Sequence, residues 1–388
     1  MKTPSSSDVQ TVRALLPGAS VGVIGGGQLG RYLVLEARRL GYVTWVLDPD
    51  AQAPAMQLAE HALVAAYDDA EALAALAEAC DAVTIEFENV PARSLALLAD
   101  RTRVAPSAEV VRVAQDRDLE KRSAEAQGLR PVPYATVECA DDVAAAVAAV
   151  GLPAILKTSR LGYDGKGQIV CDSENAVFEA LLVLQDAACV LERHITLAAE
   201  ISVVLARGFS GEIAVFPISR NVHVNGILST STVPADVSAG ILASAESQAI
   251  RLAEGLDYHG VLAVEFFIDE RGQVYFNEMA PRPHNSGHYT LDATVCSQFE
   301  MQLRALCALP LGSTTLLSPV CMINLLGDVW SSGTPDWHRV FEQAGAHLHL
   351  YGKHVARPGR KMGHINCLAD SADSATAMAV QCLSLLER

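Results

Sequence analysis

The chain has 388 residues, half of them hydrophobic, which is enough for two or three domains that each bury a core. Its formal charge of −16 at pH 7 disfavours non-specific binding to nucleic acid or to anionic membranes, because either partner would need a basic face. The N-terminal segment lacks the apolar core of a secretion signal, and the longest weakly polar run, residues 143–156, is interrupted by Gly151 and Pro153. We therefore expect a cytoplasmic protein in which local cations meet any anionic ligand.

Nine cysteines are scattered from Cys80 to Cys382 without a Cys-x-x-Cys pair. A reducing compartment fits this pattern. We interpret the individual cysteines as small buried apolar residues rather than as catalytic thiols.

The first hundred residues alternate β-branched runs with helical stretches. The predicted strands are residues 20–25, 43–48 and 82–87, and the predicted helices are 28–40, 69–79 and 92–99. This βαβαβ pattern predicts a parallel sheet covered by helices, with ligands at the carboxyl ends of its strands.

Three glycines, Gly25, Gly27 and Gly30, form a G-x-G-x-x-G turn between the first strand and the first helix, and Asp48 ends the next strand. This arrangement is the dinucleotide fingerprint. Its physical basis is that backbone N–H groups approach a phosphate at a helix N-terminus, which serves any phosphate and does not require NAD. We predict a phosphate or substrate contact here, with a purely structural tight turn as the alternative.

The middle of the chain has a different character. One charged helix is predicted over residues 108–127, and the proline-containing stretch 130–134 marks a boundary. From Tyr134 to about Pro310, closely spaced strands are joined by Gly, Asp and Ser turns, with helices only at 140–150, 174–184 and 239–255. This region is expected to be α+β with antiparallel sheets. A smaller unit follows Pro319 and ends in a helix over about 371–386.

Lys157 ends an apolar strand and is followed by a glycine-rich loop. The loop comprises Gly162, Tyr163, Asp164, Gly165, Lys166, Gly167 and Gln168. A fixed lysine supplies a point charge for a triphosphate, and a flap beside it would exclude water from the transferring phosphoryl group. An ordinary hairpin loop is the alternative.

Two further glutamates, Glu192 and Glu200, flank the segment RHITLAA. A carboxylate there can hold ribose hydroxyls, and the extended backbone from Arg193 through His194 to Ile195 can contact an adenine edge. Solvent-exposed strand glutamates are the simpler interpretation of these residues.

The strongest chemical signal is a pair of acidic residues on one predicted β-hairpin, Glu265 and Glu278. A turn over residues 269–272 predicts that Ala263 pairs with Glu278 and that Glu265 pairs with Phe276, which places both carboxylates diagonally on one face. Like charges this close repel each other unless a cation lies between them, and Mg²⁺ prefers carboxylate and phosphate oxygens. The hairpin is thus predicted to form the floor of a nucleotide triphosphate site, with Asn277 as a further oxygen donor. Alternatively, one glutamate points to solvent.

A polar run follows this hairpin directly, in the string APRPHNSGHYT. Arg282, His284, Asn285, Ser286 and His288 are candidates for binding a second substrate beside the γ-phosphate. A proline-stiffened strand exit is the alternative.

Near the end of the chain lies one dense cationic patch, formed by Lys353, Arg357, Arg360, Lys361 and His364. Such a patch suits the 5′-phosphate of a ribonucleotide. It can also be a basic surface turn or a dimer contact.

Taken in order, the motifs from Lys157 to FNEMAPRPHNSGH resemble the ATP-grasp superfamily. Together with YGK and RPGRKMGHI, they look like the family of 5-(carboxyamino)imidazole ribonucleotide synthases, and the resemblance runs from Val21 onward. It implies an ATP-grasp fold of mixed α/β and α+β class. The implied units are a Rossmann-like pre-ATP-grasp domain (1–113), an ATP-grasp domain (114–318) and a small C-terminal domain (319–388), usually assembled as a homodimer.

The resemblance also implies residue roles. ATP contacts fall on Arg117, Lys157, the loop from Gly162 to Gln168, Glu192 to Ile195, Glu200, His223, Asn277 and Glu278. Magnesium carboxylates fall on Glu265 and Glu278, with two ions possible. Lys157, Arg282, His284 and Asn285 are the implied catalytic residues. Ribonucleotide contacts fall on Gln28, Glu86 or Glu88, Ser286, Lys353, Arg360 and Lys361.

The implied reaction begins with ATP phosphorylating bicarbonate to carboxyphosphate, which then carboxylates aminoimidazole ribonucleotide. A flap and a dry site fit the fragility of carboxyphosphate. The alternatives are another ATP-grasp ligase, such as a formate-using transformylase or a biotin carboxylase, an NAD-dependent oxidoreductase, or a silent nucleotide-binding regulator.

Overall fold

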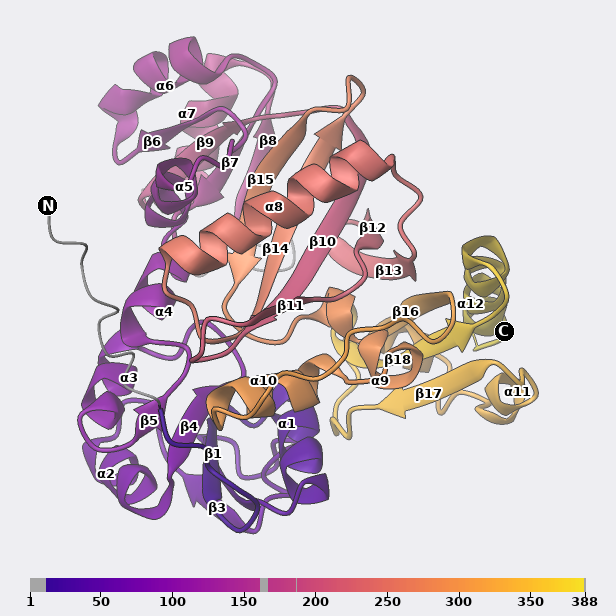
Figure 1. Cartoon of the computed structure of the whole chain (residues 1–388). Coiled ribbons are helices and arrows are strands. Elements are labelled where there is room, and N and C mark those ends of the chain that lie inside the picture. Colours follow the sequence, from indigo (N-terminus) through magenta and orange to yellow (C-terminus); the bar gives the residue numbers. More distant parts are fainter. Residues whose placement is uncertain (1–11, 161–166, 186, 387–388) are drawn as a thin grey trace, which may run out of the picture.

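The computed structural model describes residues 12–160, 167–185 and 187–386. Three sheets organise this part of the chain (Figure 1). No helix within these ranges is long and apolar enough to cross a membrane. Eight of the nine cysteines are buried, as expected of small apolar residues, and Cys139 is exposed.

The N-terminal region is a parallel five-stranded sheet in the order β3-β2-β1-β4-β5. Its strands are β1 (Ser20–Ile24), β2 (Val43–Asp48), β3 (His61–Val64), β4 (Ala82–Ile85) and β5 (Arg103–Val104), and its helices are α1 (Gln28–Arg39), α2 (Ala70–Ala79) and α3 (Ala92–Ala99). Neighbouring β1 residues bury opposite faces: Ile24 packs with α2 and α3, whereas Val23 packs with α1. The predicted helix-covered parallel sheet is confirmed.

The charged helix predicted over 108–127 is two helices, α4 (Ala108–Ala114) and α5 (Arg117–Ala126). Asp116 separates them because its carboxylate accepts hydrogen bonds from the N–H groups of Asp118 and Leu119, which caps a new helix. The break turns the start of α5 toward the middle of the molecule.

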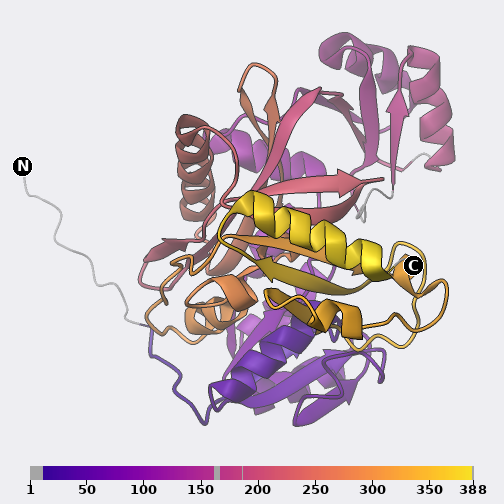
Figure 2. The ribbon, with the colours of Figure 1, turned by 90° about the vertical axis from the view of Figure 1, so that its right-hand side faces the viewer.

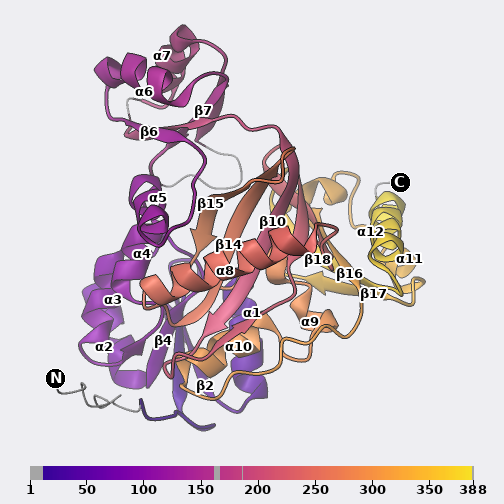
Figure 3. The same ribbon diagram turned by 45° about the horizontal axis from the view of Figure 1, so that its top comes forward.

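A small lobe follows, built on the sheet β6-β9-β7-β8, whose strand pairs are all antiparallel. Its elements are β6 (Tyr134–Val137), η1 (Ala140–Asp142), α6 (Val143–Val150), β7 (Ala154–Thr158), β8 (Gln168–Cys171), α7 (Glu174–Val183) and β9 (Cys189–Arg193). Apolar residues of both α-helices form one core with the sheet, and Figure 3 shows this lobe above the rest of the fold.

The central sheet has nine strands, in the order β15-β14-β10-β12-β13-β16-β18-β17, with β11 paired to β10. The strands are β10 (Leu197–Arg207), β11 (Ile213–Val215), β12 (Ser219–Val224), β13 (Ile227–Val233), β14 (Gly260–Asp269), β15 (Val274–Ala280), β16 (Val320–Leu326), β17 (Ala346–Leu350) and β18 (Lys361–Leu368). The strands of the predicted smaller C-terminal unit thus continue the central sheet through the β13–β16 pair.

Helices cover this sheet along its length. They are α8 (Ala239–Gly255), η2 (Asn285–Gly287), α9 (Thr290–Ala293), α10 (Gln298–Leu306), η3 (Gly327–Trp330), α11 (His338–Phe341) and α12 (Ala372–Leu386). The largest core lies between α8 and β10, β14 and β15, while α12 lies across the C-terminal strands (Figure 2).

Helix α10 was not predicted; its polar residues Gln298 and Gln302 are buried, and its polar face is reduced to the partly exposed Glu300 and Arg304. Leu303 and Leu306 pack with Val21 of the N-terminal sheet, whereas Met301 packs with Val204 of the central sheet. Through α10, the two large sheets therefore share apolar contacts on either side of one helix.

Candidate active site

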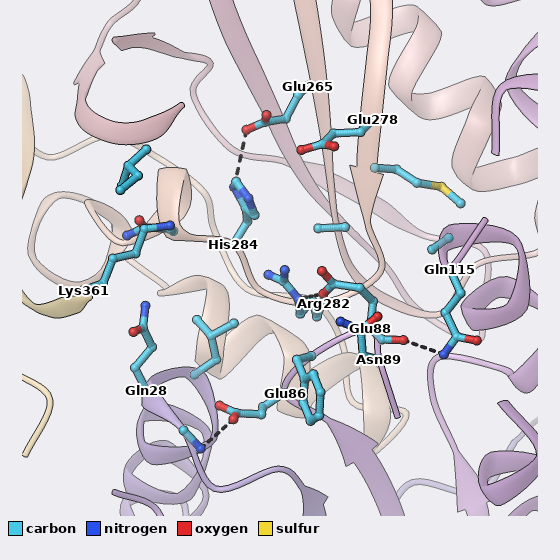
Figure 4. Close-up of a pocket in the computed structure, with 18 of the residues that line it drawn as sticks. Gln28, Glu86, Glu88, Asn89, Gln115, Glu265, Glu278, Arg282, His284 and Lys361 are labelled. Atoms are coloured by element: carbon cyan, nitrogen blue, oxygen red, sulfur yellow. Dashed lines mark hydrogen bonds and ion pairs between the residues drawn. The ribbon is translucent and has the colours of Figure 1, made fainter. Parts of the chain in front are cut away.

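Residues from the N-terminal, central and C-terminal parts of the chain enclose a cavity of about 880 Å³. Figure 4 shows Glu265 and Glu278 side by side at one end, Arg282 and His284 below them, and Gln28 with Glu86 at the opposite end. All six side chains line the cavity. The structure therefore brings these six predicted site residues to one cavity.

The two hairpin glutamates lie closer than predicted. Glu265 pairs directly with Glu278, and Ala263 pairs with Ala280 rather than with Glu278. The predicted register was wrong because the turn pairs Ile268 with Val274 and a β-bulge then inserts an extra residue before Glu278. Both side chains still share one face.

Electrostatics make this pair costly by itself. Burial and the neighbouring Glu278 raise the pKa of Glu265, although the Ser202 hydroxyl donates a 3.0 Å hydrogen bond to it. Two carboxylates in this setting need a positive charge to remain ionised together.

The bulge residue Asn277 adds a third oxygen. Its side chain is 8% exposed, and its Oδ1 has no hydrogen-bond partner among the described residues. In the same part of the chain, no group of three or more His, Cys, Asp and Glu residues is arranged to hold a metal. The two carboxylates fit a hard divalent cation that takes further ligands from water or phosphate, whereas Asn277 is not among the residues that line the cavity.

Beside the acidic pair lies a buried ionic network centred on Glu192 at the end of β9. Its two oxygens contact Lys157 Nζ at 2.7 Å and Lys121 Nζ at 2.9 Å. Burial opposes the charge of this carboxylate, but Lys121 and Lys157 lower its pKa. Burial likewise lowers the pKa of Lys157 despite the Glu192 contact. Two lysines thus share one buried carboxylate, and none of these three residues lines the cavity.

Helix α5 contributes further charges. Arg117 Nη1 lies 3.1 Å from Glu278 Oε2, and the Met279 N–H donates to Glu120. Burial and the Glu278 charge raise the pKa of Glu120 to about 8. Because Glu120 is neutral at neutral pH, it adds no further negative charge to those of Glu265 and Glu278 at the acidic end of the cavity.

The residues from Arg282 to Ser286 make different contacts. Arg282 forms an ion pair with Glu88, and burial, followed by the charge of Arg282, holds the pKa of His284 well below its usual range, so its imidazole is neutral. Asn285 exchanges side-chain hydrogen bonds with Asn324 and lines the cavity. Ser286 is fully buried and is absent from the cavity wall; its hydroxyl contacts His284 Nδ1 at 2.8 Å. A direct substrate contact for Ser286 was therefore the wrong prediction.

The glycine turn is also used differently from the prediction. The N–H groups of Gly27 and Gly30 donate to Glu86, at 2.5 and 2.8 Å, and the N–H of Gly26 donates to Asp48. Carboxylates of the chain itself occupy these amides, which contradicts a phosphate at this turn, whereas Gly27 and Gln28 line the cavity and the alternative substrate contact stays a prediction. Glu86 and Glu88 both line the cavity, so each of the two candidate glutamates faces it.

The opposite wall carries the C-terminal cations. Lys353, Arg357, Arg360 and Lys361 line the cavity, and Lys353 Nζ donates to Gln28 Oε1 at 2.7 Å. His364 does not belong to this patch: it is fully buried and its Nδ1 contacts the Tyr351 hydroxyl.

Sequence comparisons match each part of the chain to a known family. A ribonucleotide synthetase pre-ATP-grasp domain matches residues 19–115, an ATP-grasp domain 122–299, and a phosphoribosylaminoimidazole carboxylase C-terminal domain 320–378. The N5-carboxyaminoimidazole ribonucleotide synthase of Bacillus subtilis is 43% identical over 92% of this chain and 94% of its own length. That of Brucella melitensis is 44% identical over 91% and 97%.

The chain belongs to the N5-carboxyaminoimidazole ribonucleotide synthase family. Solved structures agree: an ADP complex of such a synthetase superimposes with a TM-score of 0.91 at 44% identity, covering 95% of this chain and 97% of that chain. An Aspergillus clavatus synthase in complex with ADP and 5-aminoimidazole ribonucleotide gives 0.87 at 30% identity, covering 96% and 100%. The predicted ATP-grasp fold and the predicted enzyme class, an ADP-forming carbon–nitrogen ligase, are confirmed.

The family site contains residues that the sequence did not reveal, above all Lys121 and Glu120. Both are charged yet buried on α5, at 0% and 3% exposure. The available signal was the Asp116 cap, which starts a new helix whose inward positions are 120, 121 and 124. Charged residues at such positions are almost always paired.

Other predicted ATP residues are placed less directly. His223 contacts Glu200 at 2.5 Å; burial lowers the pKa of His223, but that contact and the Glu265 charge raise it overall. The Arg193 guanidinium donates to the Val150 carbonyl, and His194 is exposed. Residues 162–166 of the predicted flap lie outside the described residues. Gly167 follows them with a left-handed φ of +71°. Gln168, the first residue of β8, pairs with Lys157 of β7.

We predict that Lys121→Met lowers stability by about 3–5 kcal/mol, because it leaves Glu192 with one buried partner. It should also raise the KM for ATP at least about tenfold while changing the KM for the ribonucleotide much less, because Lys157 then neutralises Glu192 alone. Urea unfolding and steady-state kinetics measure both effects. Arg122→Met, on the solvent side of the same helix, is the control. Unchanged ATP kinetics in a folded Lys121→Met enzyme would contradict this role.

Proposed function

We propose that this cavity joins bicarbonate to aminoimidazole ribonucleotide in two steps, at the expense of ATP. Bicarbonate oxygen attacks the γ-phosphorus, giving carboxyphosphate and ADP. The exocyclic amine of the ribonucleotide then forms a bond to the carboxyl carbon, phosphate leaves with the C–O bond pair, and the nitrogen loses one proton. The observation that carries this proposal is that the acidic hairpin pair and the C-terminal cations line one and the same cavity.

The acidic end would hold Mg²⁺ through Glu265 and Glu278, with Asn277 Oδ1 as a further ligand, and a second ion can share the same carboxylates. When bound, the metal neutralises triphosphate charge. Lys157 and Arg117 supply fixed cations for the phosphates, and Glu192 and Glu200 lie where the family pattern places nucleotide contacts. Phosphoryl transfer requires positioning and charge neutralisation more than a protein nucleophile.

The middle and far wall would take the other two substrates. Arg282, which is ion-paired with Glu88, is the cation of the run that would hold bicarbonate. His284 contributes a neutral imidazole to the same run. Lys353, Arg360 and Lys361, with Gln28, would bind the ribonucleotide phosphate. Arg offers a bidentate fork for such an oxyanion.

We also propose that the enzyme acts in the cytoplasm as a homodimer within purine biosynthesis. The family resemblance supports the assembly, and the cysteine pattern supports the compartment.

The decisive experiment follows ADP release with bicarbonate, in the presence and absence of aminoimidazole ribonucleotide. We expect release that depends on bicarbonate and rises with the ribonucleotide, together with formation of the carboxyamino product. NADH oxidation without ATP is the counter-test. ADP release that requires another acid, such as formate, and does not depend on the ribonucleotide would contradict the assignment of aminoimidazole ribonucleotide as the acceptor.

Glu278→Gln should reduce kcat by at least about a hundredfold and remove the Mg²⁺ dependence of the residual rate, because one charged metal ligand is lost. Steady-state rates over a Mg²⁺ series measure this. Glu270→Gln, at the exposed turn of the same hairpin, is the control. A near-normal rate in the folded Glu278 variant would remove the metal assignment.

Arg360→Ala should raise the KM for aminoimidazole ribonucleotide by about 10- to 100-fold and leave the KM for ATP nearly unchanged, because a charged hydrogen bond to phosphate contributes about 1.5–3 kcal/mol. Kinetics with each substrate varied in turn test this. Arg339→Ala, a surface arginine of α11, serves as the control. Equal effects on both substrates would move the phosphate site elsewhere.

A further inference from the structure

Behind the cavity, the N-terminal, central and C-terminal parts of the chain meet around a group of buried aromatic rings. Tyr32 comes from α1, His288 follows η2, and His364 lies on β18. The ring centroids are 4.9 Å apart for the two histidines, and 5.9 and 6.2 Å from Tyr32 to His288 and His364. Tyr32 is 6% exposed and both histidines are fully buried. None of the three lines the cavity.

Each of these rings ends in a polar atom without a partner. The Tyr32 hydroxyl, His288 Nε2 and His364 Nε2 have no hydrogen-bond partner among the described residues. An unsatisfied buried polar group costs about 1–3 kcal/mol, so three together are unusual in a native fold.

The surrounding hydrogen bonds fix the proton on His288. Gln298 Oε1 accepts from the His284 N–H, and Gln298 Nε2 donates to the His284 carbonyl, both at 2.8 Å. The amide orientation is thereby set, so its nitrogen faces His288 Nδ1 as a donor at 3.1 Å. Burial and the nearby His349 hold the pKa of His288 well below its usual range. The neutral ring must then carry its hydrogen on Nε2.

His364 is fixed in a similar way. Its Nδ1 lies 2.9 Å from the hydroxyl of Tyr351, which is fully buried. If the tyrosine donates, its hydrogen is satisfied and His364 carries its own hydrogen on Nε2. The opposite direction would leave the tyrosine hydrogen without an acceptor among the described residues. Two N–H donors and one hydroxyl, all without partners among the described residues, therefore belong to rings whose centroids lie 4.9 to 6.2 Å apart.

We propose that a buried water molecule binds between Tyr32, His288 and His364, and that this water holds two walls of the substrate cavity in register. It accepts from both Nε2–H groups and donates a hydrogen bond to the Tyr32 hydroxyl oxygen. Three such bonds are the usual number for an internal water.

Charge selects water over an ion. The Asp292 carboxylate accepts from His349 Nε2 at 2.8 Å and from Asn366 Nδ2 at 2.6 Å, and its negative charge adds to burial in raising the pKa of Tyr32. That charge disfavours an anion at the same place. A metal ion would need bare Nε2 atoms, but both carry hydrogen.

The three rings stand directly behind residues of the cavity. Tyr32 lies one helical turn after Gln28, His364 three residues after Lys361, and His288 four residues after His284. The bridging water thus links the wall that holds the ribonucleotide phosphate with the run beside the transferring carboxyl group. The effect of the water on substrate binding rests on the proposed function, whereas the presence of the water does not.

The first test is a high-resolution crystal structure of the ligand-free enzyme and of Tyr32→Phe. We expect one water peak within about 3.2 Å of Tyr32 Oη and both Nε2 atoms, lost or displaced in the variant. An empty chamber, rotated imidazoles with protein partners, or anomalous density from a halide or metal would overturn the site.

The second test is kinetic. Tyr32→Phe keeps the ring and should raise the KM for aminoimidazole ribonucleotide about two- to tenfold, with the KM for ATP unchanged, because one hydrogen bond is lost. Tyr42→Phe is the matched control, since its hydroxyl donates to the Leu15 carbonyl outside the cluster. Equal KM values in Tyr32→Phe and wild type would overturn the positioning role, even with the water present. Activity with a different acceptor would instead affect the proposed function and leave the density result standing.

Discussion

The arrangement of the active site depends on one unfavourable interaction, the close approach of Glu265 and Glu278 on neighbouring strands. Their direct pairing follows from the β-bulge, and burial of Glu265 reduces the screening of the repulsion by water, although Glu278 is partly exposed. Such a pair is stable in ionised form only with cations beside it. Arg117 supplies one such charge, and a metal bound with its nucleotide would supply the remainder.

The bulge has a second effect, because it adds a ligand at the same point. Asn277 is the residue that the register shift inserts, and its backbone carbonyl and its side chain have different hydrogen-bonding surroundings. The backbone oxygen accepts from Lys121 at 3.4 Å, whereas Oδ1 has no partner among the described residues. One irregularity in the ladder therefore brings two carboxylates together and leaves a buried amide oxygen without a partner among the described residues.

The amino-acid sequence predicted the elements that rest on local periodicity and the residues whose chemistry is unusual for their position. The parallel N-terminal sheet, the acidic hairpin and the cationic C-terminal loop belong to this group. The strand register could not be predicted, because a bulge leaves no local compositional signal. The glycine turn was misinterpreted since the carboxylate that occupies it, Glu86, lies 59 residues away from Gly27.

Burial explains the remaining omissions. Lys121 and Glu120 are charged residues on a helix, and in a sequence such residues indicate a solvent-exposed face. Helix α10 shows the reverse, because its polar residues Gln298 and Gln302 are buried and obscure the polar stripe from which its period would be recognised. In each case the decisive information is a tertiary contact that no local pattern contains.

Lys121 also shows how the small lobe is related to the floor of the site. Among the described elements, the extensive packing of β6 to β9, α6 and α7 lies within the lobe itself, so apolar contacts do little to fix its position on the central sheet. Lys121, on α5, contacts Glu192 of the lobe and the Asn277 carbonyl of the floor from one fully buried ammonium. Since Lys157 belongs to the same lobe and shares Glu192, its distance from the acidic hairpin is coupled to this side chain, together with the 3.0 Å hydrogen bond from the Arg117 N–H to the Ser159 carbonyl. Phosphoryl transfer depends on that distance, because the lysine would contact the phosphate oxygens of the nucleotide while the carboxylates would hold the metal ion bound to the same phosphates. A buried ionic link can set it where apolar packing does not.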